Sequence, residues 1–81
     1  MNFKALHTPT GVCAADWPDG IVQTQFVRVN GHWRRAQFAE LNHVVWFDAP
    51  EIHTRNEAVA ALHKSWQFAM EVAAERVKVA R

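Results

Sequence analysis

The sequence contains one cysteine, three glycines, three prolines and no long apolar run. Because Cys13 is alone, this chain can form neither an intramolecular disulfide nor a cage of thiolate metal ligands. The glycines are isolated from one another, which excludes a glycine-rich phosphate-binding loop. No stretch approaches the roughly 20 apolar residues of a membrane-spanning helix, and residues 1–7 lack the pattern of a signal peptide. We therefore expect a cytoplasmic protein without a membrane segment.

An excess of charge of one sign is also absent. Nine basic and eight acidic residues give a formal net charge of +1. Such a small net charge argues against a protein whose main task is to grip a nucleic-acid backbone, and it favours self-association. With 49% hydrophobic and 21% charged residues, the composition is that of a folded chain rather than a disordered one. The length of 81 residues predicts a single domain, residues 1–81.

Residues 1–47 predict an antiparallel β-meander of three or four strands. The segment Ile21–Val29 is rich in β-branched and aromatic residues, which favour strands. Asn30-Gly31 follows it and is typical of a two-residue hairpin turn, because a type I′ turn needs positive φ at both positions. The expected strands are residues 21–29, 32–40 and 44–47, with residues 3–6 and 11–15 as an edge strand or a bent pair.

The two-residue turn would place Val29 opposite His32 and thereby assign each side chain of the hairpin to a face. Neither face is purely polar, since one carries Val29 and Phe38 and the other carries Phe26 and Trp33. One face must pack on the helix. The other must then present large apolar or aromatic groups to solvent or to a partner. Both assignments are compatible with the sequence.

Residues 54–80 predict one long helix, because they include neither Gly nor Pro and their apolar residues recur at helical spacing. Two capping boxes could begin it: Asp48 with Glu51, or Thr54 with Glu57. We prefer Thr54, since the periodic pattern starts only after it. At about 1.5 Å per residue the helix would be roughly 40 Å long and should overhang the sheet. The predicted fold class is α+β: an antiparallel meander packed on one long C-terminal helix, in the order β-β-β-α.

The predicted helix has two apolar stripes. Leu62, Trp66 and Val77 belong to the main stripe, which we expect to pack on the sheet. The second stripe lies on the opposite side of the helix and consists of Ala61, Phe68, Val72 and Val79. We interpret this second stripe as a partner-binding surface, used for a homodimer or for another protein. In the alternative interpretation, Phe68 packs under Trp17 and completes a single core.

No arrangement of residues predicts catalysis or metal binding. The five histidines lie at positions 7, 32, 43, 53 and 63, without the spacing that would place two of them on one helical face. Cys13 and His7 could act as nucleophile and base only if folding brought them within hydrogen-bond distance beside an orienting group. A structural thiol is the simpler interpretation of Cys13. We expect no enzyme activity, no metal and no cofactor.

A basic and aromatic strand offers a different function. Arginines beside exposed aromatic rings can stack on bases and contact phosphates, as in sheet-based single-strand binders. The residues concerned are Arg28, Trp33, Arg34 and Arg35. Alternatively, Trp33 belongs to the core and the arginines form a solvated edge. The expected function is a small, non-catalytic, homodimeric protein-interaction module, such as a bacterial or phage-type regulator or inhibitor that binds a protein. The alternative is a nucleic-acid-binding module.

Overall fold

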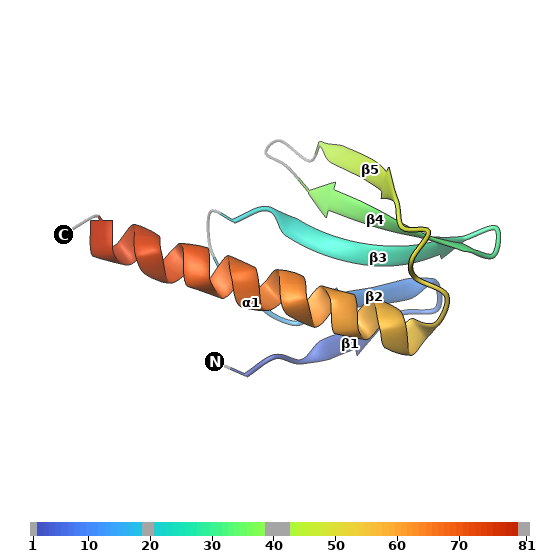
Figure 1. Ribbon diagram of the computed structural model, residues 1–81, viewed down its shortest axis with the longest axis horizontal. Coiled ribbons are helices and arrows are strands. Elements are labelled where there is room, and N and C mark those ends of the chain that lie inside the picture. The colour runs from blue at the N-terminus through green and yellow to red at the C-terminus, as the bar shows by residue number, and fades with distance from the viewer. Residues whose placement is uncertain (1, 19–20, 39–42, 80–81) are drawn as a thin grey trace.

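The computed structural model describes residues 2–18, 21–38 and 43–79, with residues 77–79 described by their backbone alone (Figure 1). Within these ranges the chain forms a sheet of five strands followed by one helix. The elements are β1 (Ala5–His7), β2 (Gly11–Ala14), β3 (Gln23–Val29), β4 (His32–Phe38), β5 (Val44–Asp48) and α1 (Arg55–Val79). Residues 39 and 40 of the predicted strand 32–40 and residue 80 of the predicted helix lie outside the described residues.

The sheet is an antiparallel meander in the order β1-β2-β3-β4-β5. The predicted α+β class, with a meander followed by a C-terminal helix, is therefore confirmed. The predicted count of three or four strands is too low. Residues 5–7 and 11–14 form a complete hairpin, in which Leu6 pairs with Cys13, and β2 then pairs with β3.

The β3–β4 hairpin has the predicted turn and register. Asn30 has a φ of 52° and Gly31 a φ of 79°, as a type I′ turn requires. Val29 pairs with His32, and the pairing continues to Gln23 opposite Phe38. The face of every side chain on these two strands follows from this register.

The first turn of α1 is capped by Thr54 and Glu57. The backbone N–H of Glu57 donates to Thr54 Oγ1 (3.2 Å), and the Thr54 hydroxyl donates to Glu57 Oε1 (3.1 Å). The same carboxylate accepts from the backbone N–H of His53 at 3.3 Å. The capping box at Thr54 is thus confirmed as the start of the helix, because these bonds satisfy donors that lack an intrahelical acceptor.

Arg55 ties the start of α1 to the β1–β2 turn. Its Nη1 donates to the carbonyl oxygens of Thr8 (3.1 Å) and Gly11 (2.7 Å). Its guanidinium carbon lies 5.9 Å from the centre of the Trp33 ring. One side chain therefore links the helix, the first hairpin and the core.

The core lies between α1 and one face of the sheet. Val12, Phe26 and Trp33 supply the sheet side, while Leu62 and Trp66 supply the helix side. Trp66 is 7% exposed, and its Nε1 donates to the carbonyl oxygen of Asp16 at 2.8 Å. The face with Phe26 and Trp33 is therefore the one that packs on the helix.

The helix covers only part of that face. It packs on β2 and β3, while β4 and β5 lie to one side of it (Figure 1). The C-terminal part of α1 extends past the sheet, in agreement with the predicted overhang, and the molecule measures 46 × 27 × 20 Å. Within the described residues, α1 consequently leaves two surfaces uncovered: the opposite face of the sheet, and the region between α1 and β4.

Candidate interaction surfaces

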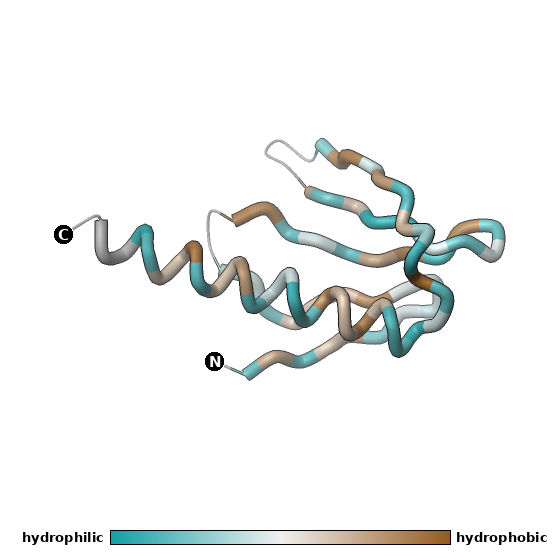
Figure 2. The backbone as a smooth tube through the Cα atoms, viewed as in Figure 1, coloured by the Kyte–Doolittle hydropathy of each residue, from teal (hydrophilic) through white to brown (hydrophobic). Residues whose placement is uncertain are grey.

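The face of the sheet that points away from α1 is called the open face below. Strand alternation and register define its members. They are Leu6, Cys13, Gln23, Gln25, Val27, Val29, His32, Arg34, Ala36, Phe38, Val44, Trp46 and Asp48. Apolar side chains form the majority of this set. Figure 2 shows that apolar residues occur on β5, which α1 does not cover, as well as on the strands that it does cover.

Large apolar side chains of the open face are accessible to solvent. Leu6, Val29, Phe38 and Trp46 are between 37% and 44% exposed. At the centre of the face, Ala36 is only 1% exposed because larger side chains surround it. A sheet face of this composition is normally covered by another layer of structure, and here the described helix lies on the other side.

The open face carries two opposite charges that lie next to each other. Arg34 Nε lies 3.2 Å from Asp48 Oδ1, an ion pair that lacks hydrogen-bond geometry. The Arg34 guanidinium carbon is also 5.4 Å from the centre of the Trp46 ring. Among the described strand residues of this face, Arg34 and Asp48 are the ones charged at neutral pH, histidine being counted as neutral. The strand residues of the open face are therefore mostly apolar and carry no net charge, while the exposed Lys4, next to β1, adds one positive charge at the edge.

A groove of about 390 Å³ lies between the second half of α1 and the helix-facing side of β3 and β4. Its apolar walls include Trp17, Val22, Phe68 and Val72. Phe68 is 68% exposed, although it belongs to a well-formed helix. Arg35 and other polar side chains complete the lining.

Arg35 holds an unusual position in this groove. Its guanidinium carbon lies 4.8 Å from the centre of the Phe47 ring. Its Nε is buried and, like that of Arg34, finds no hydrogen-bond acceptor in the part of the chain that the structure describes. Arg34, its neighbour in the sequence, points to the open face, so the two arginines serve different surfaces.

The structure divides the second helix stripe among different environments. Ala61 is partly buried and packs against the core. Phe68 and Val72 line the groove, together with Trp17. The side chain of Val79 lies outside the described residues. The stripe predicted as one partner-binding surface therefore contributes Phe68 and Val72 to a groove that the sheet completes.

The residues considered for nucleic-acid binding do not form a single surface. Trp33 is 6% exposed and belongs to the core, where it pairs across the hairpin with the exposed Arg28. Arg34 and Arg35 lie on opposite faces of the sheet. An aromatic ring that stacks on a base must be accessible, and Trp33 is not.

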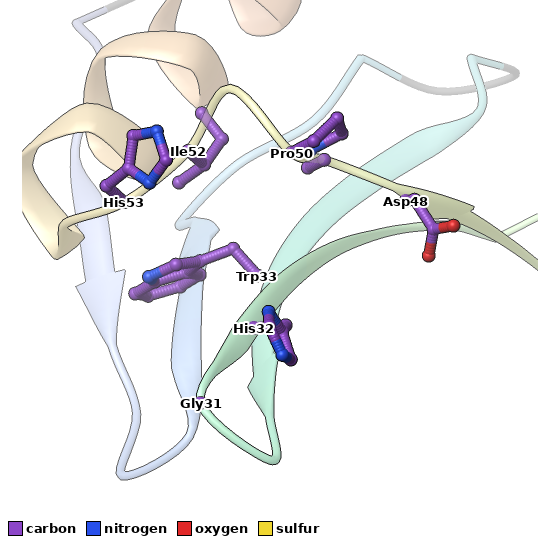
Figure 3. A pocket seen from close by; sticks show the side chains of 8 residues that line it. Gly31, His32, Trp33, Asp48, Pro50, Ile52 and His53 are labelled. Carbon is purple, nitrogen blue, oxygen red and sulfur yellow. The ribbon is translucent and has the colours of Figure 1, made fainter.

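A second hollow, of about 650 Å³, lies between the tip of the β3–β4 hairpin and the segment that leads from β5 to α1 (Figure 3). His32, Trp33, Asp48 and His53 are among its lining residues. In Figure 3 the two imidazoles lie on different sides of the Trp33 ring, and Asp48 lies away from both of them. Across the described residues, no group of three or more His, Cys, Asp or Glu side chains is arranged to hold a metal ion.

Cys13 and His7 do not form a nucleophile–base pair. In the β1–β2 hairpin, Cys13 pairs with Leu6, whereas His7 pairs with Val12. Residues that are neighbours along a strand point to opposite faces, so Cys13 lies on the open face and His7 on the other. The partly buried Cys13 thiol thus belongs to an apolar surface, and the imidazole of His7 is not placed to act as its base.

Comparisons with protein-family models, with curated proteins and with solved structures find no match for this chain. The described part of α1 lacks the combination of length and apolar composition that would let a helix cross a membrane. Sequence reasoning had left open whether the face with Val29 and Phe38 would meet a partner, and it had not singled out Leu6 or Trp46. The signal for Trp46 was the alternation within β5, which assigns it to the face of Phe38 only once the β4–β5 register is known.

Proposed function

We propose that this protein is a non-catalytic protein-interaction module that works as a homodimer, and that the open faces of two copies form the dimer contact. The observation that carries this proposal is the set of exposed apolar residues Leu6, Val29, Phe38 and Trp46 on one uncovered sheet face. Removing apolar surface of this kind from water is favourable and would stabilise a contact. A second layer of sheet is a common way to cover it.

A second copy is the partner that suits the charge of this face. Arg34 and Asp48 pair within one copy, so two open faces meet without strong repulsion. A charged partner would find no excess of charge on the strands of this face, and only Lys4 at its edge. A two-fold axis also needs only one self-complementary patch, which the open face provides.

The size of the open face is consistent with a dimer of moderate affinity. At about 3.3 Å per residue along a strand and about 4.8 Å between strands, the sheet measures roughly 20 by 20 Å. Two such faces in contact would bury on the order of 1,000 Å², near the lower limit for specific interfaces. Interfaces near this limit are typical of transient association, so dimerisation is best measured up to high micromolar concentration.

The helix contact expected from the sequence has less support than the open face. Ala61 packs against the core. Phe68 and Val72 belong to a groove whose other wall is the sheet. The nucleic-acid alternative also has less support, since Trp33 is buried and Arg34 is paired with Asp48. A regulator or inhibitor would use the groove for its protein partner and the open face for its own dimer.

Sedimentation equilibrium of the wild-type protein tests the dimer. From low to high micromolar concentration, the apparent mass should rise from that of a monomer towards that of a dimer. A protein that stays monomeric at high micromolar concentration would overturn the proposal. Aggregation without a defined dimer would also count against it, because a two-fold contact closes after two copies.

A further inference from the structure

We infer that the groove between α1 and the β3–β4 hairpin binds a short peptide segment of a partner protein, in which an acidic residue is flanked by large apolar ones. The groove lies on the side of the sheet opposite the open face. The inference therefore does not depend on the dimer, and a dimer would carry two such grooves. It rests on the residues that line the groove and on Arg35, which has no carboxylate partner among the described residues.

The walls of the groove are suited to apolar side chains. Phe68 is 68% exposed and Val22 is 48% exposed, and Val72 lies one helical turn beyond Phe68. At about 390 Å³ the groove falls within the range of about 300–1,000 Å³ that is typical of ligand sites. Trp and Arg are among the residues enriched where binding energy is concentrated, and the groove includes Trp17 and Arg35.

Arg35 supplies the charge that selects an acidic ligand. Its contact with the Phe47 ring holds the guanidinium in place, at 4.8 Å from the ring centre. No carboxylate of the described residues pairs with Arg35, and none lines the groove, whereas Arg34 has Asp48 beside it. A carboxylate can accept from the two terminal nitrogens of the guanidinium at once, in the bidentate geometry that arginine favours, and this contact does not need the buried Nε. Arg34 already forms an ion pair with Asp48, so its charge is compensated within the protein.

The shape of the groove favours a peptide segment. Its helical wall extends from Ser65 to Arg76, about 16 Å at the rise of an α-helix. About five residues of extended chain cover that distance. No carboxylate belongs to the described lining. A second copy that docked groove to groove would therefore leave both Arg35 side chains without an acceptor from that lining.

A random peptide library displayed on phage tests this inference directly. The library would be selected on immobilised wild-type protein, and a synthetic peptide of the enriched sequence would be measured by fluorescence anisotropy. We expect the enriched sequences to share an Asp or Glu between large apolar residues. No enrichment, or enrichment of sequences without an acidic residue, would overturn the inference.

Two neighbouring arginines provide the variant and its control. Arg35→Gln should weaken binding at least about tenfold, since it removes a charge-assisted pair. Arg34→Gln should leave the affinity within about twofold, because its side chain points to the opposite face of the sheet. Arg35→Lys keeps the charge but loses the bidentate geometry, and should give an intermediate loss. Equal losses for Arg34→Gln and Arg35→Gln would overturn the inference.

Further variants keep the test decisive if Arg35→Gln fails to fold. Phe68→Ser changes an exposed side chain, so the protein should fold and still lose most of its affinity for the peptide. Unchanged affinity would contradict the inference.

Trp46→Glu changes the open face alone and should bind the peptide as the wild type does. Failure of the dimer and failure of the groove can therefore be distinguished. Loss of dimerisation in Phe68→Ser would show that a second copy occupies the groove, which would also overturn the inference.

Discussion

Arg34 and Arg35 are adjacent in the sequence, yet their guanidinium groups lie over aromatic rings on opposite faces of the sheet. The Arg34 guanidinium carbon is 5.4 Å from the centre of the Trp46 ring, and that of Arg35 is 4.8 Å from the centre of the Phe47 ring. Strand alternation on β4 and β5 produces this arrangement. The two arginines differ in their surroundings: Asp48 lies 3.2 Å from Arg34 Nε, while no carboxylate of the described residues pairs with Arg35.

Replacing Trp66 with alanine should destabilise the protein severely. Trp66 is 7% exposed and bonds the carbonyl oxygen of Asp16, so Trp66→Ala loses apolar burial and leaves a cavity. We expect a loss of about 3–5 kcal/mol in the free energy of unfolding, measured by urea denaturation. Phe68→Ala on the exposed side of the helix is the control and should change stability by about 0.5 kcal/mol or less. Equal stability of the two variants would mean that the core has been assigned to the wrong helix face.

Two glycine substitutions should differ in their cost. A Cβ at position 11 would lie 2.1 Å from the carbonyl oxygen of Phe26, so Gly11→Ala requires β2 and β3 to move apart. At Gly31 a Cβ meets no atom within 4 Å, and the cost comes from the positive φ of 79°. Gly31→Ala should therefore lose about 1–2 kcal/mol. Thermal unfolding should show a lower midpoint for Gly11→Ala, and the reverse order would contradict this account of the β2–β3 contact.

Removing the Arg55 side chain should loosen the first hairpin. Arg55→Met keeps much of the apolar stem but loses both bonds to the carbonyl oxygens of Thr8 and Gly11. We expect a loss of about 1–3 kcal/mol in stability. Backbone amide exchange should rise in β1 and β2 more than in β4. Exchange that rises uniformly, or not at all in β1 and β2, would argue against a role for Arg55 in fastening this hairpin.

Short-range features of the fold could be predicted because their causes lie within a few residues. Asn30-Gly31 determines the β3–β4 turn through its positive φ values, and Thr54 with Glu57 caps α1 through bonds across three positions. The β1–β2 hairpin was recognised only as an open alternative, since β1 is three residues long. A strand that short leaves little periodic pattern to detect.

Long-range features could not be predicted from local patterns. Phe26 and Phe38 have similar chemistry, and only the packing of Leu62 and Trp66 decides which of the two faces is buried. The groove is more difficult still. Val22, Arg35 and Phe68 come from three distant segments, and no periodicity within one segment indicates that they meet.

The central claim is that two copies meet through the open face, and a matched pair of variants tests it most directly. Trp46 and Phe47 are adjacent, are 44% and 39% exposed, and point to opposite faces. Sedimentation equilibrium should be measured on the wild type, Trp46→Glu and Phe47→Glu at the same high micromolar concentration. The account predicts a dimer for the wild type and for Phe47→Glu, and a folded monomer of 9.3 kDa for Trp46→Glu. A monomeric Phe47→Glu beside a dimeric Trp46→Glu would contradict it, as would a monomeric wild type.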